Sequence, residues 1–210
     1  MIDFLLHFDK YLDSLVQAYG AFVYAILFFI VFVETGTVAA PFLPGDSLLF
    51  ASGALAAQGS LNVWWLFALL SLAAIAGDAL NYWIGYWMGK GVLEKGKLRF
   101  VKKEHLEKTQ KYFNAYGPKT IIIARFIPIV RTFAPFLAGV GKMGYPKFFA
   151  YNVFGGIPWV GLFLFTGYAF GELPLIKDNF TVVLLLVIAF SAIPLVWEFV
   201  KHRMNLQKKA

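Results

Sequence analysis

The chain has 210 residues, of which 60% are hydrophobic and only 15% are charged, and its formal net charge is +7. Soluble domains are about 25% charged, so this composition excludes a soluble enzyme, a disordered chain and a free-standing nucleic-acid module. We expect one all-α membrane domain over residues 1–210. The positive charge then belongs to cytoplasmic loops, and no nucleic-acid partner is expected.

The first segments of the chain predict an interfacial helix, a span and a broken apolar stretch. Residues 1–19 carry apolar side chains at helical spacing, which is typical of an amphipathic helix in the membrane interface. Residues 20–61 predict span 1 followed by a re-entrant hairpin, because the apolar run meets Glu34 and is then interrupted. The interrupting residues are Pro41, Pro44 and Gly45.

The middle of the chain predicts a span and a basic loop. Residues 62–88 are long and apolar enough for span 2, although Asp78 and Asn81 lie inside it. Residues 89–119 carry nine Lys or Arg against three Glu, which favours the cytoplasmic side. Within this segment, Lys103–Tyr116 predicts a surface helix that stops at the Gly-Pro pair after it.

The rest of the chain predicts a second broken segment and two more spans. Residues 120–143 predict a second re-entrant hairpin. Residues 144–200, which include Asn152, predict spans 3 and 4. Residues 201–210 predict a cytoplasmic tail. The second hairpin is broken by Arg125, Pro128, Arg131, Pro135 and Gly139. Both termini are therefore expected in the cytoplasm, with four spans and two hairpins in between.

The two broken segments echo each other. Ala40–Gly45 recurs almost letter for letter as Ala134–Gly139, and one predicted span separates the copies. Two hairpins separated by one span enter from opposite faces, as in inverted-repeat transporters whose broken helices meet at the binding site. Chance similarity in an apolar sequence of low diversity is the competing interpretation.

Five charged side chains fall in apolar surroundings, where each costs roughly 2.5–3.5 kcal/mol at a helix centre. They are Glu34, Asp46, Asp78, Arg125 and Arg131. Two interpretations stay open: salt bridges that hold the hairpins together, or a charged central cavity.

The residue types suggest a role for each group. The two arginines favour an anionic ligand, because a guanidinium grips phosphate with two parallel hydrogen bonds. The three carboxylates are candidates for charge pairing and proton coupling. An acid that alternates between binding an arginine and binding a proton would couple proton movement to transport. Asn81 and Asn152 are expected to donate hydrogen bonds between helices.

Other motifs in the sequence do not support a cofactor site or a catalytic site. Gly139–Gly144 matches G-x-G-x-x-G without the βαβ unit that a dinucleotide site requires. The Gly-Asp pairs ending at Asp46 and Asp78 would suit an intramembrane aspartyl hydrolase, but the arginines would then have no role. The chain has no cysteine and three distant histidines, so we expect no metal, no cofactor and no enzymatic activity.

Several of these motifs occur together in one known family. They are Glu34-Thr35-Gly36, Pro41–Leu49, Gly77–Tyr82 with Gly85, Ala124–Thr132 with Pro135, Gly139 and Met143, and Tyr151-Asn152 with Trp159. In these stretches the chain resembles the DedA family of bacterial inner-membrane proteins, whose shared unit is called the VTT or SNARE-associated domain. The resemblance covers roughly Leu12 to Arg203.

The resemblance implies two facing re-entrant hairpins and movement of lipid. Family members are described as translocases of undecaprenyl phosphate or other anionic phospholipids, some of them dependent on the proton motive force. The essential acids of the family fall on Glu34 and Asp46, and its essential arginines on Arg125 and Arg131. The expected partners are therefore membrane lipids and protons, with a second copy of the chain as an open question.

We therefore expect a lipid translocase of the bacterial inner membrane. Two other classes stay open at this point. A proton-coupled exporter of small cations or drugs would use the acids as its substrate site and the arginines structurally. A non-transporting membrane scaffold would need neither group for chemistry.

Overall fold

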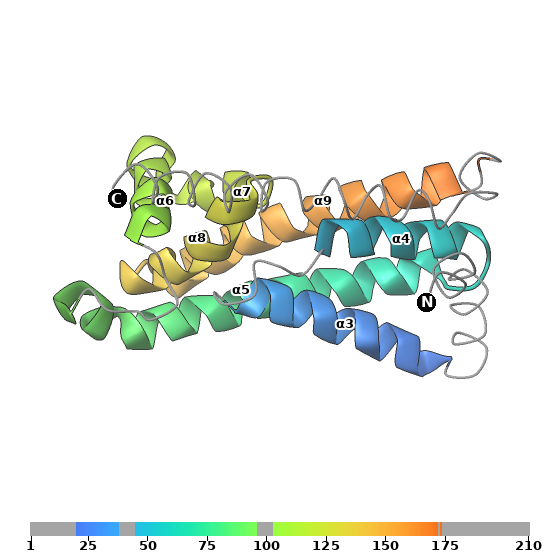
Figure 1. Cartoon of the computed structure of the whole chain (residues 1–210), viewed down its shortest axis with the longest axis horizontal. Helices are drawn as coiled ribbons and strands as arrows, with labels where there is room; N and C mark the ends of the chain where they lie inside the picture. The colour runs from blue at the N-terminus through green and yellow to red at the C-terminus, as the bar shows by residue number, and fades with distance from the viewer. Residues whose placement is uncertain (1–19, 38–44, 96–102, 172, 174–210) are drawn as a thin grey trace, which may run out of the picture. The chain divides into compact units, whose positions relative to one another are not determined.

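The computed structural model describes residues 20–37, 45–95, 103–171 and 173, and every regular element in these ranges is helical (Figure 1). The helices are α3 (Ala21–Gly36), α4 (Gly45–Ala57), α5 (Val63–Lys95), α6 (Lys103–Tyr116), the 3₁₀ turn η1 (Gly117–Lys119), α7 (Thr120–Ala124), α8 (Pro128–Val140) and α9 (Tyr145–Gly171). The all-α fold class is confirmed for these ranges. The predictions for residues 1–19, Pro41, Pro44, span 4 and residues 201–210 lie outside them.

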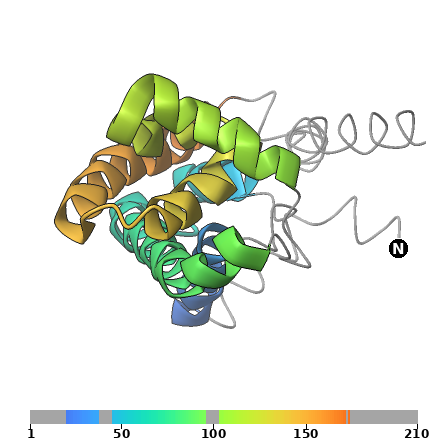
Figure 2. The ribbon, with the colours of Figure 1, turned by 90° about the vertical axis from the view of Figure 1, so that its left-hand side faces the viewer.

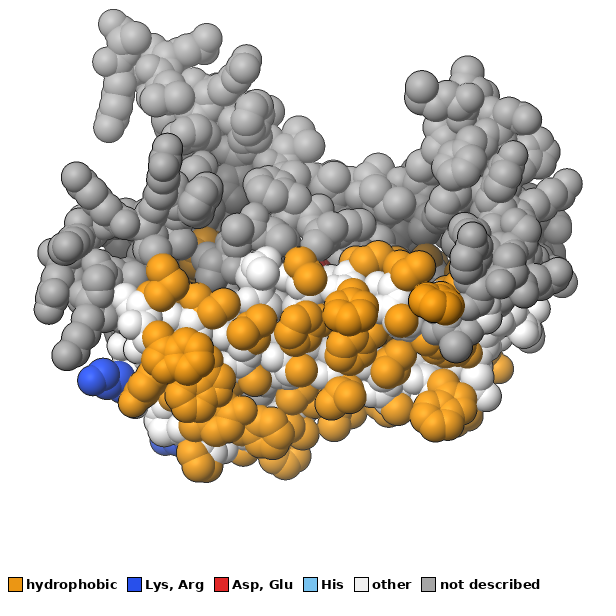
Figure 3. Space-filling view, turned by 90° about the horizontal axis from the view of Figure 1, so that it is seen from below, with side chains coloured by type: hydrophobic (Ala, Val, Ile, Leu, Met, Phe, Trp, Pro, Cys, Tyr) orange, Lys and Arg blue, Asp and Glu red, His pale blue; other side chains and the backbone are white. Residues whose placement is uncertain are grey.

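Two described helices are long and apolar enough to cross a membrane. They are Val63–Met88 within α5 and Tyr145–Gly171, which is α9. At a rise of 1.5 Å per residue, either helix spans about 39 Å, more than the hydrocarbon core of about 30 Å. Trp64 and Trp87 lie near the two ends of the first of these helices and are exposed, as in interfacial belts. Hydrophobic side chains cover much of the described face in Figure 3.

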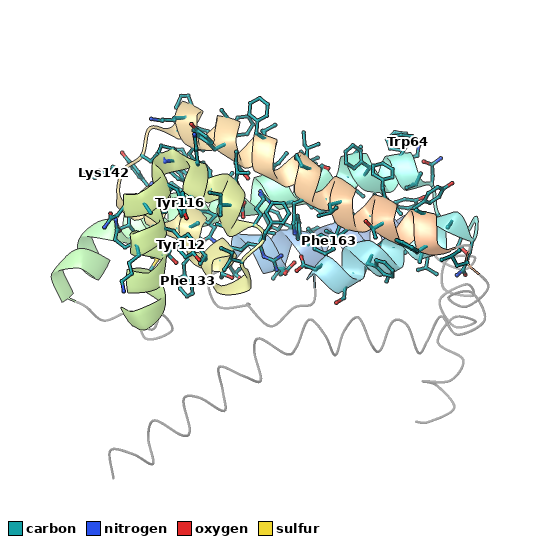
Figure 4. All side chains as sticks on the ribbon, turned by 90° about the horizontal axis from the view of Figure 1, so that it is seen from above. Trp64, Tyr112, Tyr116, Phe133, Lys142 and Phe163 are labelled. Carbon is teal, nitrogen blue, oxygen red and sulfur yellow. The ribbon has the colours of Figure 1, made fainter. Side chains whose placement is uncertain are left out.

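The surface helix and its end are placed as predicted. The helix α6 has the expected bounds and is followed by η1, where Gly117 takes a φ of +57° that favours glycine. The hydroxyl of Thr120 donates to the Tyr112 carbonyl at 2.9 Å, which ties the start of α7 to α6. In Figures 2 and 4, α6 lies against α8, with Tyr112 and Phe133 at the same end.

The second broken segment contains two helices separated by a short turn. The α7 helix ends in a tight turn in which the amide of Ile127 bonds the carbonyl of Ala124 at 2.9 Å. Ile127 is extended, as expected before proline, and Pro128 then opens α8 at a position where its missing N–H costs nothing. Arg125 therefore caps the end of α7, and Arg131 lies in the first turn of α8.

The chain divides into two compact units. The described part of one unit holds α4 and the end of α9 from Phe163 onward. The other unit holds α3 from Tyr24, α5 from Trp64, the helices α6 to α8, and α9 up to Leu162. Each unit is held by a crossing of a short helix with a long one.

In the second unit, α8 crosses α5 at a pair of glycines. A Cβ added to Gly139 would fall on the carbonyl oxygen of Tyr82 and close to the amide of Tyr86. A Cβ added to Gly85 would fall on the carbonyl oxygen of Phe136. Any side chain at either glycine therefore forces the two backbones apart.

In the first unit, α4 crosses the end of α9 in the same way. A Cβ on Gly53 would fall on the carbonyl oxygen of Leu164 and close to the amide of Tyr168. A Cβ on Gly167 would fall on the carbonyl oxygen of Phe50. In both units the short-helix glycine meets the backbone three residues before and one residue after the long-helix glycine.

This packing corrects the register of the internal echo. The letter match aligns Gly139 with Gly45, whereas the crossings make Gly139 the counterpart of Gly53. The long helices agree, because Gly85–Gly89 and Gly167–Gly171 share the pattern Gly-Tyr-x-x-Gly. Close backbone approach, which requires glycine, fixes this register at Gly53 and Gly139.

Candidate functional site

The first acid–arginine pair joins α5 to the break between α7 and α8. Nη2 of Arg125 lies 2.5 Å from Oδ2 of Asp78, and the two side chains are 1% and 3% exposed. The same Nη2 donates to Oδ1 of Asn152 at 2.5 Å. Asn152 in turn donates from Nδ2 to the Ile75 carbonyl at 2.9 Å. The pair is thus held from both α5 and α9.

Two other donors of this arginine are left over. Nε and Nη1 of Arg125 are buried and have no hydrogen-bond partner among the residues that the structure describes. The side chain lies along two glycines of α9, since a Cβ on Gly155 would be 3.2 Å from Nε and one on Gly156 3.1 Å from Nη2. A buried donor without an acceptor costs about 1–3 kcal/mol, more when charged, so these N–H groups favour an anion beside them.

The second pair joins α3 to α8. Nη2 of Arg131 lies 2.5 Å from Oε1 of Glu34. Glu34 is in the last turn of α3 and its side chain is 3% exposed, whereas the side chain of Arg131 is 12% exposed. This pair therefore lies closer to the surface of the described chain than the first pair does.

Asn81 fastens the backbone around this second pair. Its Nδ2 donates to the Thr132 carbonyl at 2.9 Å and to the Thr35 carbonyl at 3.3 Å. These two threonines directly follow Arg131 and Glu34 in the sequence. The amide of Asn81 thus bonds the backbones of α3 and α8 beside the ion pair.

Both guanidinium groups lie over one indole ring. The Cζ atom of Arg125 is 5.7 Å from the centroid of the Trp159 ring, and Cζ of Arg131 is 5.1 Å from the same centroid. Trp159 is fully buried on α9. The ring therefore connects the two acid–arginine pairs into one site, with cation–π contacts on both arginines.

The site was only partly accessible to sequence analysis. It contains Glu34, Asp78, Arg125, Arg131, Asn81 and Asn152, all within the second unit. Sequence analysis names Trp159 as a motif residue and gives it no role. The missed signal is spacing, because Asn152, Gly155, Gly156 and Trp159 recur at three or four residues and so share one face of α9.

The hairpin-shaping residues and Asp46 are placed less fully. Asp46 lies in the first turn of α4, in the first unit, so its role as a charge partner stays a prediction. Gly45 begins α4, Pro128 begins α8 and Pro135 lies within α8. Among the described residues, no three His, Cys, Asp or Glu side chains gather as metal ligands do.

The chain is similar over most of its length to known membrane proteins. Residues 43–169 match the VTT domain family. The chain is 49% identical over 205 residues to Protein DedA of Escherichia coli K12, covering 97% of this chain and 94% of that protein.

Two more distant relatives are also named as membrane proteins. Inner membrane protein YghB of E. coli K12 is 34% identical over 157 residues, covering 75% of this chain and 72% of YghB. Uncharacterized membrane protein Rv0364 of Mycobacterium tuberculosis is 38% identical over 178 residues, covering 84% of this chain and 78% of Rv0364. No solved structure matches the chain.

Proposed function

Because the chain belongs to the DedA family of VTT-domain membrane proteins, we propose that it moves an anionic lipid across the bilayer, with undecaprenyl phosphate as the first candidate and anionic phospholipids as the second. The observation that carries the proposal is the placement of two guanidinium groups over one ring, of which the buried one, Arg125, has two N–H donors that lack an acceptor among the described residues. In an apolar helical protein these donors need a hydrogen-bond acceptor, and a negatively charged one binds them most strongly.

A phosphate head group supplies what these donors lack. Its oxygens accept N–H bonds from a guanidinium, and Nε and Nη1 of Arg125 are donors that have no acceptor among the described residues. The polyprenyl or acyl tail stays in the surrounding lipid, where it costs no burial of polar groups. The head group alone then crosses the low-dielectric region.

Charge balance in the site suggests that lipid transport is coupled to proton binding. The Arg131–Glu34 pair is neutral as a unit, so a phosphate that takes Arg131 leaves a carboxylate that is 3% exposed without its arginine. A buried carboxylate in that position is most easily accommodated by accepting a proton. We infer proton-coupled transport, with Glu34 as the group that exchanges, Asp46 as a further acid of the pathway and Asp78 as the charge partner of Arg125.

The membrane arrangement follows the sequence pattern. We propose that α7 and α8 form one re-entrant hairpin, and that the broken segment of residues 42–61, which contains α4, forms the other, within a four-span protein of the bacterial inner membrane. The basic loop and both termini face the cytoplasm under this proposal. The prolines and glycines at 41, 44, 45, 128, 135 and 139 shape the broken backbone.

The competing classes fit the site less well. A cation exporter would bind its substrate at acids, but Glu34 and Asp78 each hold an arginine at 2.5 Å. A scaffold does not require charged groups in the interior, and buried ion pairs often contribute little net stability. Transport of an anion uses both the pairs and the unsatisfied donors.

Reconstituted vesicles test the proposal directly. Purified protein is placed in liposomes with mass-detectable undecaprenyl phosphate, and its appearance in the opposite leaflet is followed over time. We expect the wild type to move the lipid and Arg131→Ala and Arg125→Ala to abolish the movement. Lys142→Ala is the matched control, since it removes an exposed cation outside the site. Unchanged movement in both arginine variants would refute the site.

The proton step has its own test. Glu34→Gln keeps the shape of the side chain and removes its charge, so we expect transport that no longer responds to a pH gradient. Asp46→Asn is measured beside it, because the role of Asp46 rests on the sequence alone. Transport and pH response that stay intact in both amide variants would exclude proton coupling through these acids.

A further inference from the structure

Arg131 is held in two ways that do not depend on Glu34. The backbone next to it is fixed by the bond from Asn81 to the Thr132 carbonyl at 2.9 Å. The guanidinium lies over the ring of Trp159, with Cζ 5.1 Å from the centroid. The ion pair with Glu34 is therefore one of several contacts that place this arginine.

The contact with the indole ring differs chemically from the contact with the carboxylate. A carboxylate occupies N–H donors of the guanidinium, and a phosphate must compete with the carboxylate for the same donors. An aromatic ring attracts the face of the guanidinium and leaves the N–H edge available to another acceptor. The ring thus holds the cation without blocking the anion that binds it.

The neighbouring arginine is held by side-chain partners from two other helices. Arg125 is bound to Asp78 and Asn152 by its Nη2, and its stem lies against Gly155 and Gly156. Removing the indole would leave these contacts in place. The ring therefore matters more to the position of Arg131 than to that of Arg125.

We propose that Trp159 is a positioning residue for lipid binding, which keeps the Arg131 guanidinium in the site while a phosphate head group replaces Glu34. Arg125 stays bound to Asp78 throughout, and the exchange of partners takes place at Arg131 alone. This inference rests on the proposed function and assigns the exchange step to one of its two arginines. Trp159 itself makes no bond to the phosphate.

The test separates binding from turnover. Transport rates are measured against undecaprenyl phosphate concentration in liposomes for the wild type, Trp159→Phe and Trp159→Leu. We expect Trp159→Leu to raise KM about tenfold, equivalent to about 1.4 kcal/mol, with a much smaller change in kcat. Trp159→Phe keeps an aromatic face with a weaker cation–π contact and should give an intermediate KM.

A matched truncation distinguishes positioning from packing. Phe148→Leu removes another fully buried aromatic ring of the same unit, in the cluster around Tyr82. We expect its KM to equal that of the wild type. If Trp159→Leu does not yield folded protein, the ratio of KM between Trp159→Phe and the wild type decides, and a ratio below twofold overturns the inference.

The outcomes also separate this inference from the proposed function. A wild-type protein that moves no lipid refutes both. A wild type that moves lipid, together with equal KM in the Trp159 and Phe148 variants, refutes the positioning role and leaves the function standing. A higher KM in the Trp159 variants alone supports both.

Discussion

The two arginines on either side of the α7–α8 break are held in different ways. Arg125 is 1% exposed, and its Nη2 is shared between Asp78 and Asn152. Arg131 is 12% exposed, and the asparagine beside it bonds the neighbouring backbone instead of the guanidinium. A guanidinium enclosed by side-chain partners from two helices is costly to move, whereas a more exposed one that a ring and its own backbone help to place can exchange its carboxylate for a phosphate. The comparison therefore assigns a fixed anion-binding position to Arg125, which stays paired with Asp78, and the exchange of partners to Arg131.

The largest expected effect is the loss of the enclosed arginine. Arg125→Met leaves Asp78 buried without its cation, and breaking a buried pair costs about 3–5 kcal/mol. We expect Arg131→Met to lower the free energy of unfolding by clearly less, because the side chain of Arg131 is more exposed than that of Arg125. Thermal unfolding of both variants in the same detergent measures the difference. Equal losses would remove the distinction between the pairs.

The next effect concerns the crossing that places Arg131. Gly139→Ala puts a Cβ on the Tyr82 carbonyl and pushes α8 away from α5, where Asn81 lies. Overpacking of this kind costs about 1–3 kcal/mol. Gly53→Ala makes the same backbone clash in the first unit, so it should destabilise similarly and raise the KM for lipid less than Gly139→Ala does.

A glycine with no neighbouring atoms is the control for both glycine substitutions. Gly144 has no atom within 4 Å of an added Cβ, so Gly144→Ala should be close to neutral in the same unfolding measurement. If Gly144→Ala lowered stability as much as Gly139→Ala, the loss would not come from the helix crossing.

The two asparagines give a smaller and more specific contrast. Asn152→Ala removes an acceptor from a buried cation, at a cost of about 1.5–3 kcal/mol. Asn81→Ala removes two bonds to neutral carbonyls, about 0.5–1.5 kcal/mol each. We expect Asn152→Ala to affect mainly the unfolding temperature and Asn81→Ala mainly the KM for lipid. The reverse pattern in paired unfolding and transport assays would interchange the roles of the two pairs.

The smallest expected effect is at the glycines beside Arg125. An alanine Cβ at Gly156 would lie 3.1 Å from Nη2, so the guanidinium must shift by a few tenths of an ångström. We expect Gly156→Ala to cost about 1 kcal/mol and to leave transport through Arg131 active. Complete loss of transport in a folded Gly156→Ala protein would mean that Arg125 must also keep an exact position for the ligand.

Sequence patterns predicted the features of the fold that depend on neighbouring residues in the chain. The composition and long apolar runs predicted spans within residues 62–88 and 144–200, where the structure has the helices Val63–Met88 and Tyr145–Gly171, and the Gly-Pro pair correctly ended α6. The break between Arg125 and Arg131 was also predicted, because Pro128 cannot continue a helix from α7. Each of these features is decided within a few residues of the chain.

What depends on tertiary packing was not predicted. Which acid binds which arginine follows from how α3 and α5 cross, and that crossing is set by close contacts at Gly36 and Gly77. The role of Trp159 is hidden for the same reason, since a buried tryptophan in an apolar helix resembles ordinary core. The echo at Gly45 and Gly139 was misleading because matching letters do not show which glycines touch another helix.

The central claim is that a phosphate head group binds at Arg131 in place of Glu34. An experimental structure of the protein with bound undecaprenyl phosphate tests it most directly. The account predicts phosphate oxygens within hydrogen-bond distance of Arg131 and of Nε or Nη1 of Arg125, Glu34 turned away, and the Arg125–Asp78 pair unchanged. A phosphate bound elsewhere, with the Glu34–Arg131 pair intact beside it, would contradict the account.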